Sequence, residues 1–176
     1  MNIEAKSSNF DKRDNVSKQT ESIYEIGVTD LDGKFVKLAK YAGKCMLIVN
    51  IASELRQNIN QLRTLVKTSG KGLLGTVHCV VLFFPSNQFL GMPEKTSADT
   101  KSFICQQDVD FAETFAKVEV NGQSSHPLFK FLKQRRPGWI SWNFTKFLVS
   151  KNGQKIERFN HQILFAAIES EIVIMI

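Results

Sequence analysis

The sequence predicts an α/β domain whose mixed central sheet is flanked by helices and preceded by an N-terminal β-hairpin. Two short apolar segments, Met46–Leu55 and Val77–Phe84, have the length and composition of buried strands. A segment with helical spacing follows the first of them, and Asn152-Gly153 between two apolar runs is a strong hairpin signal. Strands that alternate with helices before a hairpin favour a mixed sheet with helices on both faces.

The N-terminal part of the chain divides into a tail and a hairpin. Residues 1–21 are polar and carry both charges, which predicts a flexible or partner-ordered tail and a domain over residues 22–176. Ile23–Val28 and Phe35–Leu38 predict the two strands of a hairpin that turns at Asp32-Gly33.

The remaining elements follow in an alternating order. Met46–Leu55 predicts a central strand that leads into a helix, in which five apolar residues recur at helical spacing: Leu55, Ile59, Leu62, Leu65 and Val66. Further helices are predicted over Ser97–Gln106, over His126–Lys133 and from Ile163 to the C-terminus, and further strands over Val77–Phe84, Thr145–Ser150 and Lys155–Phe159. This order of elements is typical of a thioredoxin-like fold.

Composition narrows the class of protein. The 176 residues suit one domain with one core, and a net charge of +6 without a dense basic block argues against a nucleic-acid partner. The sequence has no segment apolar enough for a transmembrane helix or a secretory signal. Three widely spaced cysteines, Cys45, Cys79 and Cys105, indicate neither a disulfide framework nor a zinc site, so we expect an intracellular, reducing compartment such as the cytoplasm or the mitochondrion.

Several motifs occur together and in a fixed order. They are Asp32-Gly33-Lys34, Ile48–Ser53 (Ile-Val-Asn-Ile-Ala-Ser), Phe84–Phe89 (Phe-Pro-Ser-Asn-Gln-Phe), Val120-Asn121-Gly122 and Trp142–Phe147 (Trp-Asn-Phe-Thr-Lys-Phe). In these motifs the chain resembles the glutathione peroxidase family over about residues 22–176. The resemblance implies a thioredoxin-like fold and reduction of hydroperoxides by a selenocysteine or cysteine that a Gln, a Trp and an Asn assist.

The residues that the resemblance assigns to catalysis are only partly present. The nucleophile position falls on Leu55, followed by Arg56, and the Gln position falls on Met92. Trp142 and Asn143 match the other two catalytic positions. Peroxide reduction needs an ionised soft nucleophile, and N–H donors alone reduce nothing. The catalytic positions Leu55, Met92, Trp142 and Asn143 are therefore interpreted as vestigial.

Structural explanations exist for the residues that remain. The Trp142 indole can be a core residue and the Asn143 amide the cap of a turn. Cys105 resembles the resolving cysteine of thioredoxin-dependent members, although a half-buried helix cysteine is the simpler interpretation. Cys45 and Cys79 lie in apolar strands and are predicted to be packing residues.

The C-terminus points to a protein partner. It ends in five apolar residues, Ile172, Val173, Ile174, Met175 and Ile176, and one domain cannot cover all sides of such a helix. A frayed tail or an added edge strand is the alternative. The basic residues Lys133, Arg135 and Arg136 are a solvated cluster or, as in relatives, an attractor of glutathione.

Three functions follow from these observations. The first is a glutathione-peroxidase-like protein that has lost catalysis and serves as a structural or interaction subunit of a larger assembly. The second is a weak thiol peroxidase that acts through Cys105 with glutathione or thioredoxin in an oxidative stress response. The third, a redox-independent binder of glutathione or lipid hydroperoxide, rests only on the basic cluster. No metal or cofactor is predicted, and glutathione is the possible ligand or reductant.

Overall fold

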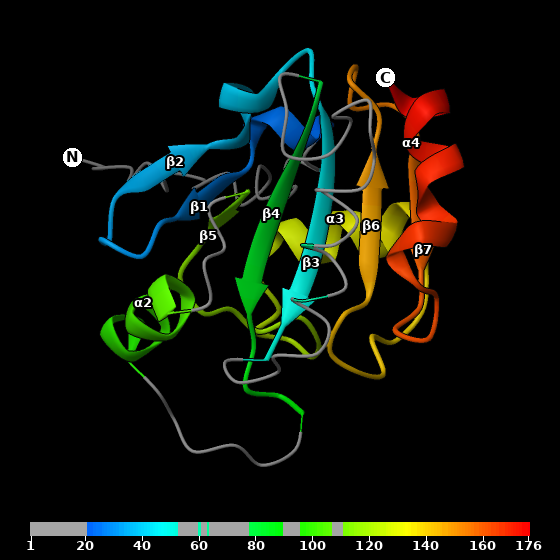
Figure 1. Cartoon of the computed structure of the whole chain (residues 1–176). Coiled ribbons are helices and arrows are strands. Elements are labelled where there is room, and N and C mark those ends of the chain that lie inside the picture. The colour runs from blue at the N-terminus through cyan, green and yellow to red at the C-terminus, as the bar shows by residue number, and fades with distance from the viewer. Residues whose placement is uncertain (1–20, 53–59, 61–62, 64–77, 90–95, 107–110) are drawn as a thin grey trace, which may run out of the picture.

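The computed structural model describes residues 21–52, 60, 63, 78–89, 96–106 and 111–176. Its centre is a five-stranded sheet in the order β5-β4-β3-β6-β7 (Figure 1). The strands are β3 (Cys45–Ile51), β4 (Cys79–Pro85), β5 (Ala112–Thr114), β6 (Lys146–Val149) and β7 (Ile156–Phe159). β3, β4 and β5 run parallel, whereas β6 and β7 are antiparallel to their neighbours. The predicted mixed sheet is confirmed.

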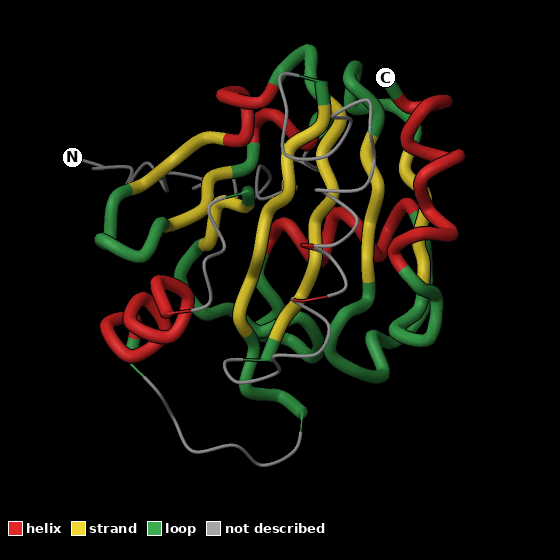
Figure 2. Tube along the Cα trace, viewed as in Figure 1, coloured by secondary structure: helices red, strands yellow, loops and turns green. Residues whose placement is uncertain are grey.

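Every residue of β3 is buried, because helices cover both faces of the sheet. Met46 and Ile48 point to a core that includes α3 (Pro127–Arg135). Leu47 and Val49 point to the opposite core, which includes α4 (Glu169–Met175). Figure 2 shows these helices in red on either side of the yellow strands. The continuous apolar composition of Cys45–Ile51 therefore reflects two buried faces.

The N-terminal hairpin forms a separate two-stranded sheet of β1 (Gly27–Thr29) and β2 (Phe35–Lys37). The predicted first strand is too long, because Ile23–Glu25 forms the 3-10 helix η1, whose start the Ser22 side chain caps by accepting a hydrogen bond from the Tyr24 amide at 3.3 Å. A second 3-10 helix, η2 (Leu38–Tyr41), follows β2. Residues 1–20 of the predicted tail lie outside the described residues, which begin at Glu21.

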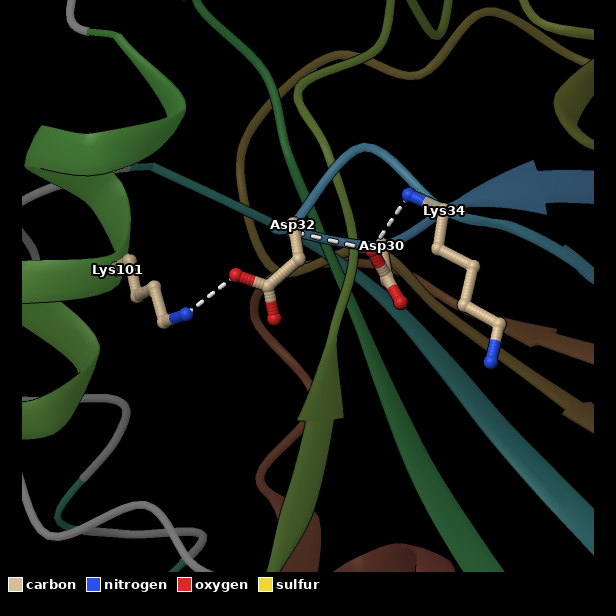
Figure 3. A network of polar contacts seen from close by, with 4 residues as sticks. All are labelled: Asp30, Asp32, Lys34 and Lys101. Carbon is tan, nitrogen blue, oxygen red and sulfur yellow. Dashed lines mark hydrogen bonds and ion pairs between the residues drawn. The ribbon is translucent and has the colours of Figure 1, made fainter.

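A polar network holds the turn of this hairpin (Figure 3). The Asp30 carboxylate accepts hydrogen bonds from the amides of Asp32 and Lys34, both at 2.9 Å. The Asp32 carboxylate forms an ion pair with Lys101 of α2 (Ser97–Gln106). This exposed pair joins the hairpin to α2, whose predicted range is confirmed.

α3 begins one residue after its predicted start at His126 and ends at Arg135, two residues beyond the predicted Lys133. His126 is its N-cap and accepts a hydrogen bond from the Leu128 amide through Nδ1 at 3.2 Å. Pro127 occupies the first helical position, where its missing N–H costs no hydrogen bond. The apolar face of α3 then packs on the sheet through Leu128, Phe129, Phe131 and Leu132.

The C-terminal helix is shorter than predicted. The segment that begins at Ile163 contains a 3-10 helix, η3 (Phe165–Ile168), and then α4. A turn precedes η3, because the Asn160 side chain accepts a hydrogen bond from the Gln162 amide at 2.9 Å. The Lys146 ammonium also donates to the Ile163 carbonyl at 2.6 Å, which ties this turn to the sheet. A helix cannot begin at Ile163 in this arrangement.

The edge strand β5 and the helix after β3 remain to be compared with the sequence-based prediction. The edge strand β5 was not predicted, since three residues carry too little periodicity to indicate a strand. Of the helix predicted after β3, only Asn60 and Arg63 are described, and both are helical. Among the described residues, no helix has the length and apolar character to cross a bilayer.

Candidate functional site

The candidate site lies at the carboxyl end of β3, where Asn50 anchors the turn before β6. The side-chain Nδ2 of Asn50 donates to the Trp142 backbone carbonyl at 3.2 Å. The Phe144 backbone N–H donates to the backbone carbonyl of Asn50 at 2.7 Å. The Thr145 hydroxyl donates to the same Trp142 carbonyl at 3.3 Å. Phe144 adopts a left-handed φ of 65°, which reverses the chain there. These contacts bring Trp142 and Asn143 beside the end of the strand.

Trp142 is at the surface of this site. Its side chain is 37% exposed and its ring centroid lies 6.2 Å from that of Phe89. The prediction that this indole is a core residue is therefore wrong in part, because about a third of the residue is exposed although its ring contacts Phe89. An exposed indole can still donate its N–H to a bound molecule.

Asn143 is the most unusual polar residue of the site. It is fully buried, and neither its Nδ2 nor its Oδ1 has a hydrogen-bond partner among the described residues. The predicted turn cap is therefore not formed within the described part of the chain, where Asn50 holds the turn instead. A buried amide without partners costs free energy, which is typical of a side chain kept for a ligand or a reacting group.

A second hydrogen-bond network holds the loop that leads to the site. The sequence analysis gave no role to its residues. The Gln88 side chain accepts hydrogen bonds from the amides of Val120 and Asn121, at 2.7 and 2.9 Å. The Asn121 side chain in turn donates to the Ile140 carbonyl at 2.7 Å and accepts from the Ile140 amide at 3.1 Å. The motifs that contain Gln88 and Asn121 are thus structural clamps on the loop that leads to Trp142. Their location within short polar motifs was the signal that pointed to them.

Two other residues of the loop after β4 have buried polar atoms. Ser86 is buried, and its hydroxyl accepts a long hydrogen bond from the Gln88 amide at 3.5 Å. Asn87 has a buried Nδ2 without a partner among the described residues. Ser86 is therefore a buried hydroxyl of the loop that follows β4.

Three predicted site residues cannot be placed. Leu55 and Met92 lie outside the described residues. Cys105 lies on α2, but its side chain is not described. The structure therefore places Trp142 and Asn143 at the candidate site, whereas the nucleophile position, Leu55, is identified from the sequence motif alone.

The other two thiols are packing residues, as predicted. Cys45 and Cys79 are free, fully buried and directly opposite each other on β3 and β4. A hydrogen bond with the Cys45 side chain and burial raise the pKa of the Cys79 thiol. A protonated, enclosed thiol is a poor nucleophile. Within the described ranges, no group of His, Cys, Asp and Glu side chains is arranged to hold a metal ion.

The five apolar residues at the C-terminus have different environments. Ile172 and Met175 are buried against the sheet, and Ile176 is half-buried. Val173 and Ile174 are 60% and 65% exposed on the outer side of α4. Only these two of the five present a large apolar surface to solvent.

Comparison with known proteins agrees with this geometry. A family profile described as glutathione peroxidase matches residues 23–133. The probable glutathione peroxidase 5 of Arabidopsis thaliana is 40% identical over 164 residues, which cover 89% of this chain and 91% of that protein. Glutathione peroxidase 1 of Caenorhabditis elegans is 39% identical over 145 residues, or 78% of this chain and 86% of that protein.

Solved structures show the same fold. GPX1 of T. cruzi superposes with a TM-score of 0.67 at 32% identity, covering 88% of this chain and 96% of that one. The thioredoxin-like superfamily protein SPOA0173 superposes with a TM-score of 0.59 at 10% identity, covering 88% and 96% of the two chains, which concerns the fold alone.

Proposed function

The chain belongs to the glutathione peroxidase family, and we propose that it has lost the peroxidase reaction and acts as an interaction subunit of a larger assembly. The observation that carries this proposal is Leu55 at the position where the family motif has its nucleophile. An alkyl side chain cannot attack a peroxide oxygen or form a sulfenic acid.

The chemistry of the remaining residues supports this proposal. Trp142 and Asn143 offer N–H donors that would stabilise a thiolate or a leaving oxygen. Such donors lower a barrier only when a nucleophile is present to make the new bond. The substitution of Met92 for the family's Gln removes one further donor.

A partner contact is proposed on the outer side of α4. Val173 and Ile174 are exposed there, and Ile163 and Leu164 expose further apolar surface before η3. Exposed apolar side chains that occur together are a common feature of protein interfaces. The proposed contact therefore consists of Val173 and Ile174, while Ile172 and Met175 serve the core.

The test of lost catalysis compares three proteins in hydroperoxide consumption, with glutathione and with thioredoxin as separate reductants. We expect no turnover from the natural chain and measurable turnover from Leu55→Cys, because the substitution restores a thiol beside the retained donors. Leu55→Ser is the matched control, since it removes the same alkyl group without adding a soft nucleophile. Turnover by the natural chain would contradict the proposal.

The test of the interaction role is the native mass of the protein after gentle purification from its source. We expect a complex larger than one chain, and we expect Val173→Glu with Ile174→Glu to release the monomer. The control is Lys37→Glu, an exposed position on β2. A lone monomer from the natural chain would count against the interaction subunit.

A second candidate function is a thiol peroxidase that acts through Cys105. The observation that favours it is the burial of Cys45 and Cys79, which leaves Cys105 as the remaining thiol to consider. Its thiolate would attack one oxygen of ROOH and release ROH, and two glutathione thiols would return the sulfenic acid to the thiol with release of water and glutathione disulfide. Turnover that Cys105→Ser abolishes would establish this function.

A further inference from the structure

A cavity of about 350 Å³ lies at the other end of the sheet from the candidate site. It is lined by Arg135, Arg136, Gln154, Lys155 and Ile156, which come from the end of α3 and the β6–β7 hairpin. Because β6 is antiparallel to β3, its hairpin end adjoins Cys45, whereas Trp142 and Asn143 adjoin the opposite end. The cavity is therefore separate from the residues assigned to the family's chemistry.

Positive charge dominates the cavity. Arg136 forms an ion pair with Glu157 at 2.8 Å. Arg135 donates to the Glu21 backbone carbonyl at 3.1 Å and its guanidinium lies 4.9 Å from the Phe131 ring centroid, but neither group carries a negative charge. Among the described residues, the Lys155 ammonium has no hydrogen bond or ion pair; only the Lys155 backbone N–H donates, to the Ser150 hydroxyl at 3.0 Å. Three cationic side chains thus line the cavity, and one of them is paired with a carboxylate.

Another cation, Arg158, holds the loop that follows α3. The Arg158 guanidinium donates to the carbonyls of residues 136, 137, 138 and 139 at 2.8 to 3.3 Å. These carbonyls belong to the C-cap residue of α3 and to the loop that follows it. Arg158 satisfies them, so Arg135 and Arg136 are not needed for that role.

We propose that this cavity binds a small molecule that carries a phosphate monoester. A guanidinium presents its N–H groups in a planar fork that matches phosphate oxygens, and Lys155 and the Gln154 amide add further donors. The volume of about 350 Å³ is within the range of small-molecule sites and exceeds what one phosphate group fills, which leaves room for an organic group. Lys133, the third member of the predicted basic cluster, donates to the Val120 carbonyl at 2.6 Å and is not among the lining residues.

The test uses isothermal titration calorimetry on the full chain at low ionic strength with three probes: AMP, adenosine and glutathione. We expect AMP to bind and adenosine not to bind, because the phosphate supplies the charge that the arginines and the lysine recognise. The double variant Arg135→Gln with Lys155→Gln should weaken AMP binding by about tenfold or more, since two charged contacts are lost. Both positions are exposed, so folding should be preserved, and circular dichroism checks it.

The matched control is Lys37→Gln with Lys130→Gln, which removes the same net charge from exposed positions outside the cavity. It should weaken AMP binding by less than the double variant does, because neither lysine lines the cavity. Three results would each overturn the proposal: no AMP binding, AMP binding that the double variant leaves unchanged, or glutathione binding at least as tight as that of AMP. None of these results depends on whether the chain reduces peroxides, so the proposal stands or falls separately from the proposed function.

Discussion

Replacement of Asn143 by leucine should stabilise the protein. The side chain is fully buried and both polar atoms of its amide lack partners among the described residues. A buried polar group without a hydrogen bond costs about 1–3 kcal/mol, and leucine has nearly the same shape without the polar atoms. We therefore expect Asn143→Leu to raise the free energy of unfolding by about 1–3 kcal/mol.

The matched control is Asn121→Leu, at an asparagine that is equally enclosed but fully paired. Asn121 exchanges two hydrogen bonds with the Ile140 backbone, at 2.7 and 3.1 Å. Its replacement leaves a buried carbonyl and a buried N–H unpaired, so we expect a loss of at least about 2 kcal/mol. The same substitution at two buried asparagines should thus have opposite effects on stability.

Urea unfolding followed by far-UV circular dichroism measures both changes, with the slope of the transition checked for equality among the variants. The Asn143 reasoning is refuted if Asn143→Leu destabilises the protein as Asn121→Leu does. That result would mean that residues outside the described ranges pair with the amide and that Asn143 has a structural role. A functional role predicts one further result: in the Leu55→Cys background, Asn143→Leu should lower peroxide turnover while it raises stability.

Three further predictions concern charged residues of the scaffold. Arg158→Met should lower the free energy of unfolding by about 2–3 kcal/mol, because the guanidinium donates to four successive carbonyls; a change within about 0.5 kcal/mol in urea unfolding would contradict this. Burial lowers the pKa of His126 below its ordinary 6.5, so the unfolded state binds more protons and stability should fall as pH decreases below 6.5. His126→Asn, which keeps an N-cap without a titrating group, should show less of this fall, and an identical pH profile would contradict the assignment. Burial lowers the pKa of Lys146 from 10.5 to about 8 in the folded state, so between these pH values the unfolded state binds more protons. The free energy of unfolding of the natural chain should therefore increase, relative to that of Lys146→Met, as the pH is raised from 8 to 10.5. Parallel pH profiles of the two proteins would contradict this prediction.

The sequence alone was enough to establish the family and most of the elements. Apolar runs of strand length identified β3 and β4, and Asn152-Gly153 identified the β6–β7 hairpin, because these are local patterns with one dominant structural solution. Leu55 at the nucleophile position was equally visible, since it requires only a motif and a count of residues. The edge strand β5 and the 3-10 helices were not predicted, because segments of three or four residues are too short to show a periodic hydrophobic pattern.

Only the tertiary structure decided the roles of the polar side chains. Sequence motifs contain Asn50, Asn121 and Asn143 alike, yet the first two hold loops and the third is buried without described partners. The division of the C-terminal residues into buried Ile172 and exposed Ile174 likewise depends on how α4 meets the sheet. Hydrogen bonding and burial depend on contacts between segments that are far apart in the chain, as Gln88 and Asn121 are, and a linear pattern does not contain those contacts. The fold therefore followed from local patterns, whereas the function of each buried amide depended on long-range packing.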